Sequence, residues 1–431
     1  MDAIRKKTYK ALRKSERFFK TDMIYLAKGG AWLSAGQFVS SVSAFLLAIA
    51  FANLLPKETY GTYKYVLSMA SILAIPTLAG INTALTQAVA RGYEGSFIPA
   101  LKTKLLWGIW GGIGCILLAA YYYLNGNITL TFAFLIASFF IPVVDTLGIY
   151  GSLLNGKKLF KEATKFHITS RIATALILAA AIFFTDNLFI ILLSYFLPWT
   201  LFRALFLAIV IRKNLASDKE DPQVISYGKH LSVIGVLGNI ATRLDNILLF
   251  HYLGAAQVAI YTFAFAPVDQ IKALYKMIPL LSLPKFANRS IESINTLLAE
   301  RLIKLLFVGS AVAAVYIISA PYLFKLLFPQ YLDSVYFSQL LAIILALRPP
   351  VSLVSSAVQS KLNLIPKRWL YWRNTSHAIF IAALLTLTPA LGILGAIISR
   401  IIFILAQFGV NIIHWTLLTK KDRSRRTLKR L

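Results

Sequence analysis

The sequence predicts an all-α integral membrane protein with about twelve transmembrane helices, and three observations support this class. Hydrophobic residues make up 58% of the 431 residues and charged residues only 14%, whereas a soluble protein carries about 25% charged residues. Apolar stretches long enough to cross a hydrocarbon core of about 30 Å recur along the whole chain. The net charge is +28, but the basic residues lie at the ends of these stretches, so we expect no nucleic-acid partner.

The predicted spans follow one another through short connections such as 125–127, 185–187 and 389–392, which are typical of antiparallel neighbouring helices. Residues 1–28 are expected to form a basic amphipathic segment on the cytoplasmic membrane surface, and residues 417–431 a basic cytoplasmic tail. The expected span cores, in chain order, are 29–52, 63–90, 104–124, 128–153, 166–185, 188–211, 228–250, 259–283, 301–319, 335–358, 370–389 and 392–416.

The basic residues outside these cores and at their edges predict how the chain is oriented. Nearly all of them fall on one side of the predicted membrane, and only Lys57, Lys64 and Lys325 are assigned to the other side. The positive-inside rule then places both termini in the cytoplasm and the protein in the cytoplasmic (inner) membrane as a multi-pass protein. The basic termini are expected to contact anionic membrane lipids.

A short pattern occurs once at the end of the first span and again at the end of the seventh. Leu54 is followed by a turn, the small residue Gly61 and then Tyr63, and Leu253 is followed by a turn, Ala259 and Tyr261. Both copies enter the membrane from the cytoplasmic side, which predicts two parallel repeats of six helices. The predicted lobes are residues 29–211 and 228–416, joined by a cytoplasmic linker at 212–227.

Basic residues inside the predicted spans are the strongest functional signal. A cation near the bilayer centre costs about 2.5–3.5 kcal/mol on insertion scales, so cells keep such residues mostly where they meet a counter-ion, a polar cavity or a substrate. Three acids, Asp145, Asp245 and Asp269, lie in comparable positions. The excess of positive charge predicts an anionic substrate. The basic residues are Arg171, Arg203, Arg243, Lys272, Lys276, Arg348 and Arg400.

Three segments resemble a known family. Residues 52–92 contain a leucine and a turn, an acidic residue, a small residue and an aromatic one (LLPKETYGTY), then a glycine well along the next helix. This segment resembles the opening hairpin of oligosaccharide flippases of the polysaccharide-biosynthesis family. Residues 243–269 are similar to the seventh and eighth helices of that family, and residues 327–343 to its external segment, with Pro329 where glycine is usual.

The resemblance implies a fold and a function. The family belongs to the superfamily of multidrug and toxin extrusion transporters and peptidoglycan lipid flippases, so it implies two six-helix lobes around a central cavity. It implies an alternating-access transporter, not an enzyme, that moves a polyprenyl-pyrophosphate-linked oligosaccharide from the inner to the outer leaflet. The product would serve surface polysaccharides of the O-antigen, capsule or teichuronic type, and polysaccharide polymerase machinery is an expected partner.

Helix periodicity suggests which side chains would bind such a substrate. Arginine binds phosphate in a bidentate manner and stays charged when buried, so Arg203, Arg243, Lys272 and Arg348 are predicted to contact the pyrophosphate. A simpler alternative is that Asp269 neutralises Lys272 three residues away and that Arg243 pairs with a carboxylate of another helix. The predicted glycan contacts, for which helix packing is the alternative role, are Gln37, Asn82, Gln87, Asn239 and Asn246.

The energy source and the competing functions are less constrained. Asp145, Asp245 and Asp269 are candidates for proton or sodium coupling, although the membrane potential alone is an alternative driving force. No cofactor or metal site is expected, because the histidines are scattered. A multidrug antiporter of the same fold would need an acidic cavity. A glycan polymerase or transferase would need clustered carboxylates or histidines, and the external segment 320–334 holds only Asp333.

Pro76 and Gly80 predict a bend in the second span.

Overall fold

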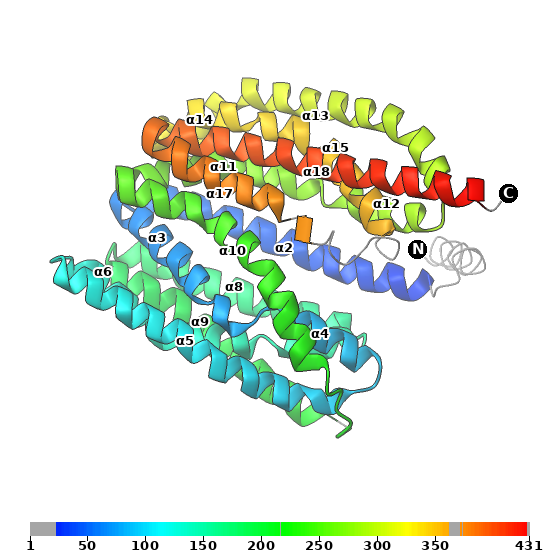
Figure 1. Ribbon diagram of the computed structural model, residues 1–431. Coiled ribbons are helices and arrows are strands. Elements are labelled where there is room, and N and C mark those ends of the chain that lie inside the picture. Colours follow the sequence, from blue (N-terminus) through cyan, green and yellow to red (C-terminus); the bar gives the residue numbers. More distant parts are fainter. Residues whose placement is uncertain (1–22, 216, 362–370, 373, 429–431) are drawn as a thin grey trace, which may run out of the picture.

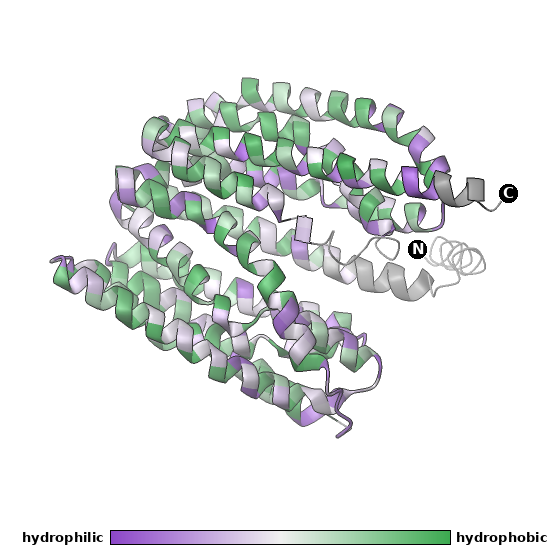
Figure 2. Ribbon diagram, in the orientation of Figure 1, coloured by the Kyte–Doolittle hydropathy of each residue, from purple (hydrophilic) through white to green (hydrophobic). Residues whose placement is uncertain are grey.

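The computed structural model describes residues 23–215, 217–361, 371–372 and 374–428. Within these residues every regular element is a helix (Figure 1), as the sequence predicts. Most of the predicted amphipathic segment 1–28 and the last residues of the basic tail lie outside the described residues. Hydrophobic residues dominate both bundles of helices (Figure 2), which accords with a membrane-embedded protein.

The first lobe contains the helices up to Asn214. Two of its helices begin at asparagines in the predicted turns: the side chain of Asn127 accepts a hydrogen bond from the backbone N–H of Leu130, and Asn187 caps the next turn in the same way. The elements are α2 (Met23–Leu54), α3 (Lys57–Leu73), η1 (Ile75–Thr77), α4 (Gly80–Ala90), η2 (Glu94–Ser96), α5 (Phe97–Leu124), α6 (Ile128–Leu147), α7 (Tyr150–Gly156), α8 (Phe160–Phe184) and α9 (Leu188–Asn214).

The second lobe begins with α10, which starts four residues before the predicted core at 228. The predicted span 259–283 is broken at Tyr275 and Lys276, so that it forms two helices. The elements are α10 (Val224–Leu253), α11 (Ala255–Leu274), α12 (Met277–Ala287), α13 (Ile291–Leu327), η3 (Pro329–Tyr331), α14 (Ser334–Leu341), α15 (Ile343–Ser360), α17 (Thr375–Leu391) and α18 (Ile393–Leu428).

Among the described residues, nine helices are long and apolar enough to cross a membrane, and ten when the bent second span is counted as one. The helix α17 is apolar but shorter, and α11 and α12 are not among these spans. The protein is therefore a multi-pass membrane protein, while the count of twelve spans stays a prediction.

The second span bends by 43° where the sequence predicts a bend. Pro76 lies in η1 and has no backbone N–H to continue the α-helical ladder. Leu78 then adopts a left-handed conformation, with φ of 56°, before α4 begins at Gly80. The lack of a side chain at Gly80 lets α4 lie directly against the backbone of α10 at Gly228 and Ser232.

The two ends of the molecule are packed differently. We call the end that holds Met23 of α2 and Leu428 of α18 the terminal end, and the opposite end the far end (Figure 1). One continuous apolar core joins both lobes toward the far end, with Phe51 from the first lobe and Phe263 from the second among its buried residues. At the terminal end each lobe has its own core, apart from Val224 of α10, which joins the first-lobe core. The lobes therefore meet at the far end and have separate cores at the terminal end.

Polar and aromatic contacts close the far end. Lys57 of α3 forms an ion pair with Asp333, with 3.1 Å between Nζ and Oδ2. The rings of Tyr60 and Phe263 stack with centroids 4.5 Å apart. A side chain at Gly61 would collide with the backbone carbonyl of Ala255, so this glycine is needed for the close approach of α3 and α11.

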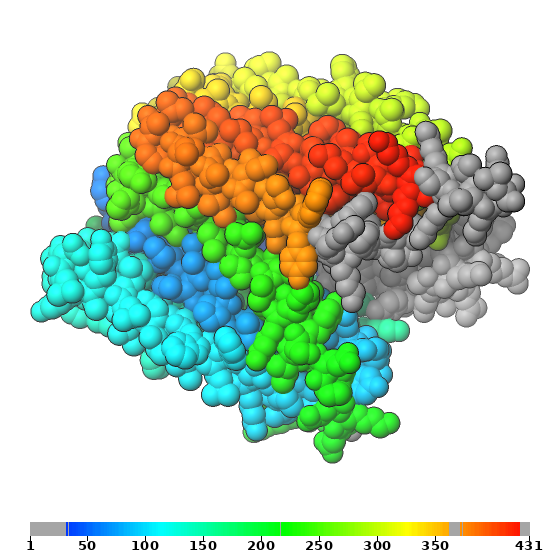
Figure 3. All heavy atoms as spheres, viewed as in Figure 1, coloured from blue at the N-terminus to red at the C-terminus, as the bar shows by residue number. Residues whose placement is uncertain are grey.

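The helix α10 links the two lobes. It packs against α4 and α3 of the first lobe and against α17 of the second, and its contact with α4 lies near its start, at Gly228 and Ser232. Figure 3 shows this helix, in green, running from the second-lobe helices onto the first-lobe helices. A polar side chain on α10 can therefore reach a cavity that is otherwise built from the first lobe.

Candidate functional site

The larger of two neighbouring cavities lies inside the first lobe and has a volume of 390 Å³. Its walls come from α2, α3, α6, α8 and α9, and one residue, Arg243, reaches it from α10. The charged residues in its lining are Lys64, Arg171, Arg243 and Asp145. We call it the charged cavity. Its lining also contains the aromatic residues Phe51, Tyr60, Tyr63, Tyr195, Phe196 and Trp199.

The three cations of the charged cavity lack carboxylate partners. Within the described part of the chain, neither Lys64, Arg171 nor Arg243 has an acidic oxygen within 4.0 Å. The single acid in the lining, Asp145, is paired with another residue, Arg203. Three donors of positive charge in a partly apolar cavity form a site for an anion with several oxygens, because charge-assisted bonds to guanidinium are strong.

Sequence reasoning missed two of these three cations. Lys64 was counted as a charge at the outer edge of the predicted span 63–90, but in the structure it lines the cavity from α3. Arg171 was recognised as an intramembrane base but was left out of the predicted phosphate contacts. The helical spacing of Tyr60, Lys64 and Ser68 on one face of α3 is the signal that identifies Lys64.

The four predicted phosphate contacts do not share one cavity. Arg243 lines the charged cavity, whereas Arg203 lines the second one, and Lys272 and Arg348 line neither. Lys272 forms the ion pair with Asp269 that their spacing of three residues predicts. Arg348 donates a hydrogen bond from Nη1 to Oε1 of Gln407 at 2.7 Å.

The second cavity has a volume of 270 Å³ and lies on the terminal side of the charged cavity. Trp199 of α9 lines both cavities and therefore separates them. The Arg203 guanidinium lies over the Trp199 ring, 4.6 Å from its centroid. The same guanidinium contacts the Asp145 carboxylate at 3.5 Å and the carbonyl oxygen of Val144 at 2.5 Å.

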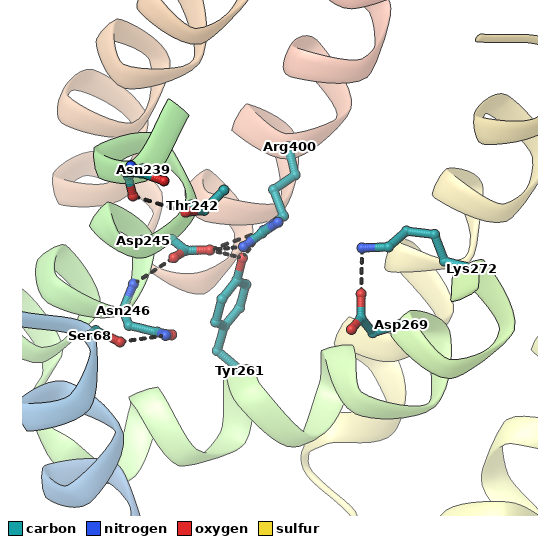
Figure 4. A network of polar contacts seen from close by, with 9 residues as sticks. All are labelled: Ser68, Asn239, Thr242, Asp245, Asn246, Tyr261, Asp269, Lys272 and Arg400. Atoms are coloured by element: carbon teal, nitrogen blue, oxygen red, sulfur yellow. Dashed lines mark hydrogen bonds and ion pairs between the residues drawn. The ribbon is translucent and has the colours of Figure 1, made fainter. Parts of the chain in front are cut away.

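The second lobe contains a buried network of paired charges. The Asp245 side chain is only 1% exposed and is paired with Arg400 of α18. It also accepts hydrogen bonds from the Tyr261 hydroxyl at 2.8 Å and from the backbone N–H of Asn246 at 2.9 Å. Figure 4 shows Arg400, Tyr261 and Asp245 pointing toward one another, with the Asp269–Lys272 pair apart from them. The Asp245 carboxylate is already neutralised by Arg400. Holding the helices of the second lobe together is therefore an alternative to its predicted role in ion coupling.

The predicted glycan contacts are spread over three helices. Gln37 of α2 lines the second cavity. On α4, Asn82 has a buried Oδ1 without a hydrogen-bond partner in the described residues, and Gln87 is exposed. On α10, Asn239 is exposed, whereas Asn246 donates to the Ser68 hydroxyl of α3 at 3.1 Å (Figure 4). Asn246 thus links the two lobes. Across the described residues, no group of histidine, cysteine and acidic residues has the arrangement of a metal site.

Comparisons with known proteins identify similar sequences and folds. The sequence profile of a family described as polysaccharide biosynthesis protein matches residues 26–288. The chain is 22% identical over 280 residues to an uncharacterized membrane protein of Methanocaldococcus jannaschii. That alignment covers 58% of this chain and 55% of the relative, so the chain spans about half the length of the curated relative that it matches.

Solved transporters share the fold. The lipid II flippase MurJ in an inward closed conformation matches with a TM-score of 0.67 and 14% identity over 89% of each chain. The inward-facing conformation of a multidrug resistance MATE family transporter of the MOP superfamily matches with a TM-score of 0.61 and 12% identity, over 90% of this chain and 96% of that one. These likenesses confirm the predicted two-lobed helical membrane fold.

Proposed function

Because this chain belongs to the polysaccharide biosynthesis protein family, we propose that it is a flippase for a polyprenyl-pyrophosphate-linked oligosaccharide. It moves this lipid from the inner to the outer leaflet of the cytoplasmic membrane by alternating access, for surface polysaccharide biosynthesis. A polar saccharide head cannot cross the hydrocarbon core unaided, while its polyprenyl tail need not leave the lipid. A transporter of this substrate must give the head a polar chamber within the membrane.

The charged cavity is the observation that carries this proposal. Each intramembrane cation costs about 2.5–3.5 kcal/mol to insert, and Lys64, Arg171 and Arg243 meet no carboxylate of the described chain that would offset this cost. A diphosphate supplies negative charge and several acceptor oxygens. The guanidinium groups of Arg171 and Arg243 would each donate two bonds to it, and Lys64 would act as a point charge.

The packing of the two ends supports a direction of transport. The basic connections and both termini belong to the terminal end, which the positive-inside rule assigns to the cytoplasm. The far end is closed by the Lys57–Asp333 ion pair and the Tyr60–Phe263 stack. In this state the charged cavity would receive substrate from the cytoplasmic side, and release would require these far-end contacts to break.

The sign of the cavity charge argues against export of cationic drugs. Such a substrate would meet three like charges and a single acid, Asp145, that is already paired with Arg203. Of the three acids predicted to couple transport to an ion, we select Asp145. It lines the cavity and its side chain is 55% exposed, whereas Asp245 is buried in its network. Protonation of Asp145 would free Arg203 and raise the positive charge beside the substrate.

Reconstitution tests the proposal. The purified protein is placed in vesicles that carry an undecaprenyl-pyrophosphate-linked disaccharide, and arrival of the sugar on the other leaflet is followed with an impermeant glycosidase. We expect faster translocation than in protein-free vesicles, and a loss of at least about tenfold in Arg171→Ala and Arg243→Ala. Lys325→Ala, on the exposed face of α13 outside both cavities, is the control and should match the wild type. A wild-type rate equal to that of empty vesicles would refute the flippase assignment.

A further inference from the structure

The second cavity differs from the charged cavity in its electrostatics. Its arginine, Arg203, is neutralised by Asp145 at 3.5 Å and capped by the Val144 carbonyl at 2.5 Å. The other titratable residues in its lining are Tyr150 and His167, and histidine is mostly neutral at pH 7. The second cavity therefore has little net charge, and a diphosphate has no reason to prefer it.

Two buried polar groups in its lining lack partners. The hydroxyl of Thr164, a residue that is only 4% exposed, has no hydrogen-bond partner among the described residues, and neither has the Oδ1 atom of Asn155. An unsatisfied buried polar group costs about 1–3 kcal/mol. Neither atom is exposed to the cavity in this state, but rotation of either side chain would offer it to a ligand with several hydroxyl groups, whereas a lipid tail would leave both unsatisfied.

The remaining lining residues are suited to contact the apolar face of a sugar ring. Trp199 and Tyr150 contribute aromatic surface, and Gln37 adds an amide at the α2 wall. Ligand sites commonly combine such apolar walls with a few polar groups that fix orientation. The volume of 270 Å³ lies just below the usual range of ligand pockets, which begins at about 300 Å³. This chemistry and size match one sugar ring.

We infer that the second cavity is the binding site for the first sugar of the lipid-linked saccharide, the one bonded to the diphosphate. This inference rests on the proposed function and assigns the sugar and the diphosphate to separate sites. Because Trp199 lines both cavities, the bond between sugar and phosphate would pass beside its ring. Asn155 and Thr164 would then determine which sugar is accepted, since neither lines the charged cavity.

Two classes of probe separate the sites. Binding to the purified full-length protein is measured for undecaprenyl pyrophosphate and for undecaprenyl pyrophosphate bearing glucose, galactose or their N-acetylamino derivatives. We expect the wild type to bind at least one of the four glycosylated lipids about tenfold more tightly than undecaprenyl pyrophosphate. Asn155→Leu and Thr164→Val should remove about this tenfold preference and change binding of undecaprenyl pyrophosphate less than twofold.

Controls make the outcomes distinct. Thr386→Val removes a hydroxyl from the exposed face of α17 and should leave both affinities unchanged. Arg171→Ala should weaken all probes alike. Equal affinity of the wild type for all five lipids, or an equal loss for all of them in Asn155→Leu and Thr164→Val, would overturn the sugar site while leaving the diphosphate site intact. No binding of any probe to the wild type would instead overturn the proposed function. Thr164→Val alone decides the matter should Asn155→Leu fail to fold.

Discussion

The network around Asp245 and the charged cavity place their intramembrane cations in opposite ways. In the second lobe, Arg400 and Lys272 are paired with the carboxylates of Asp245 and Asp269. In the first lobe, Lys64 and Arg171 face a cavity without a carboxylate partner in the described chain, and Arg243 of α10 joins them there. A paired cation stabilises the packing of its helices, whereas an unpaired cation beside a cavity is available to a ligand.

This difference shows that the position of a charge along the membrane normal does not define its role. Taking a charge out of water is costly wherever it occurs, and either a protein carboxylate or an anionic ligand can offset that cost. The Asp245–Arg400 and Asp269–Lys272 pairs offset it within the protein. In the charged cavity, Lys64, Arg171 and Arg243 have no such partner among the described residues, and under the proposed function a bound diphosphate would offset the cost.

The largest expected effect is the loss of stability on breaking the buried pair of the second lobe. Arg400→Ala leaves the Asp245 carboxylate, which is 1% exposed, without its counter-ion. Removal of one partner of a buried pair costs about 3–5 kcal/mol, so thermal unfolding in detergent should show a strong loss. The double variant Asp245→Asn/Arg400→Ala should recover much of it. Equal stability of Arg400→Ala and the wild type would break the comparison between the lobes.

The second prediction concerns the unpaired cation Arg243. Arg243→Ala removes charge-assisted bonds worth about 1.5–3 kcal/mol, which corresponds to about a 10- to 100-fold weaker binding of undecaprenyl pyrophosphate. Its unfolding free energy should change by less than about 1 kcal/mol, because the side chain is exposed to the cavity and forms no ion pair with described residues. Calorimetric titration and thermal unfolding measure the two effects. A large loss of stability with unchanged binding would reverse the assigned roles.

The third prediction concerns the far end, where the lobes are joined. A side chain at Gly61 would meet the Ala255 backbone, so Gly61→Ala should weaken closure by about 1–3 kcal/mol. The Gln330 side-chain amide donates a hydrogen bond to the backbone carbonyl of Asn53 at 3.1 Å, so these two positions are close in this state. Cysteines introduced at both positions therefore report closure through cross-linking, once the native Cys115 is replaced. We expect a lower cross-linking yield in Gly61→Ala.

A matched glycine keeps this test specific. Gly409 of α18 has open space where a side chain would be, so Gly409→Ala should leave the cross-linking yield as it is in the wild type. Full cross-linking in Gly61→Ala would mean that the far end closes without this contact.

The smallest effect is expected at Lys272. Its partner Asp269 has a side chain that is 50% exposed, and such accessible pairs contribute about 0–1 kcal/mol. Lys272→Ala should therefore change the unfolding free energy by less than about 1 kcal/mol. It should also change the affinity for undecaprenyl pyrophosphate less than twofold, because Lys272 lines neither cavity. A loss of affinity as large as that of Arg243→Ala would extend the binding site into the second lobe.

Much of the fold could be predicted because membrane spans are local patterns. Apolar length, short polar turns and Pro76 led to the helices, their antiparallel order and the bend in the second span. The predicted span 259–283 is broken at Tyr275 and Lys276, just before Pro279; the prolines of this span marked it as able to bend, but its apolar composition, which continues on both sides, did not show that it divides into two helices. The start of α10 four residues early reflects the usual uncertainty of helix ends.

The candidate site was only partly predictable. The sequence indicated an anionic substrate and named Arg243, but it grouped Arg243 with Arg203, Lys272 and Arg348, which the fold separates. It counted Lys64 among the charges at the outer edge of the second span, because a charge near the end of an apolar stretch is usually close to the membrane surface. Whether the Lys64 side chain points into the cavity depends on residues that are near it in space but far from it in the sequence.

The sequence by itself determined that this chain crosses a membrane many times, that its basic residues lie mostly on one side, and that its interior carries excess positive charge. These properties follow from composition and spacing along the chain. Only the tertiary structure decided which cations meet a carboxylate and which face a cavity, since each pairing joins helices far apart in sequence, as in Asp245 with Arg400. The cost of a buried charge depends on what lies within a few ångströms in space, and that distance is set by packing.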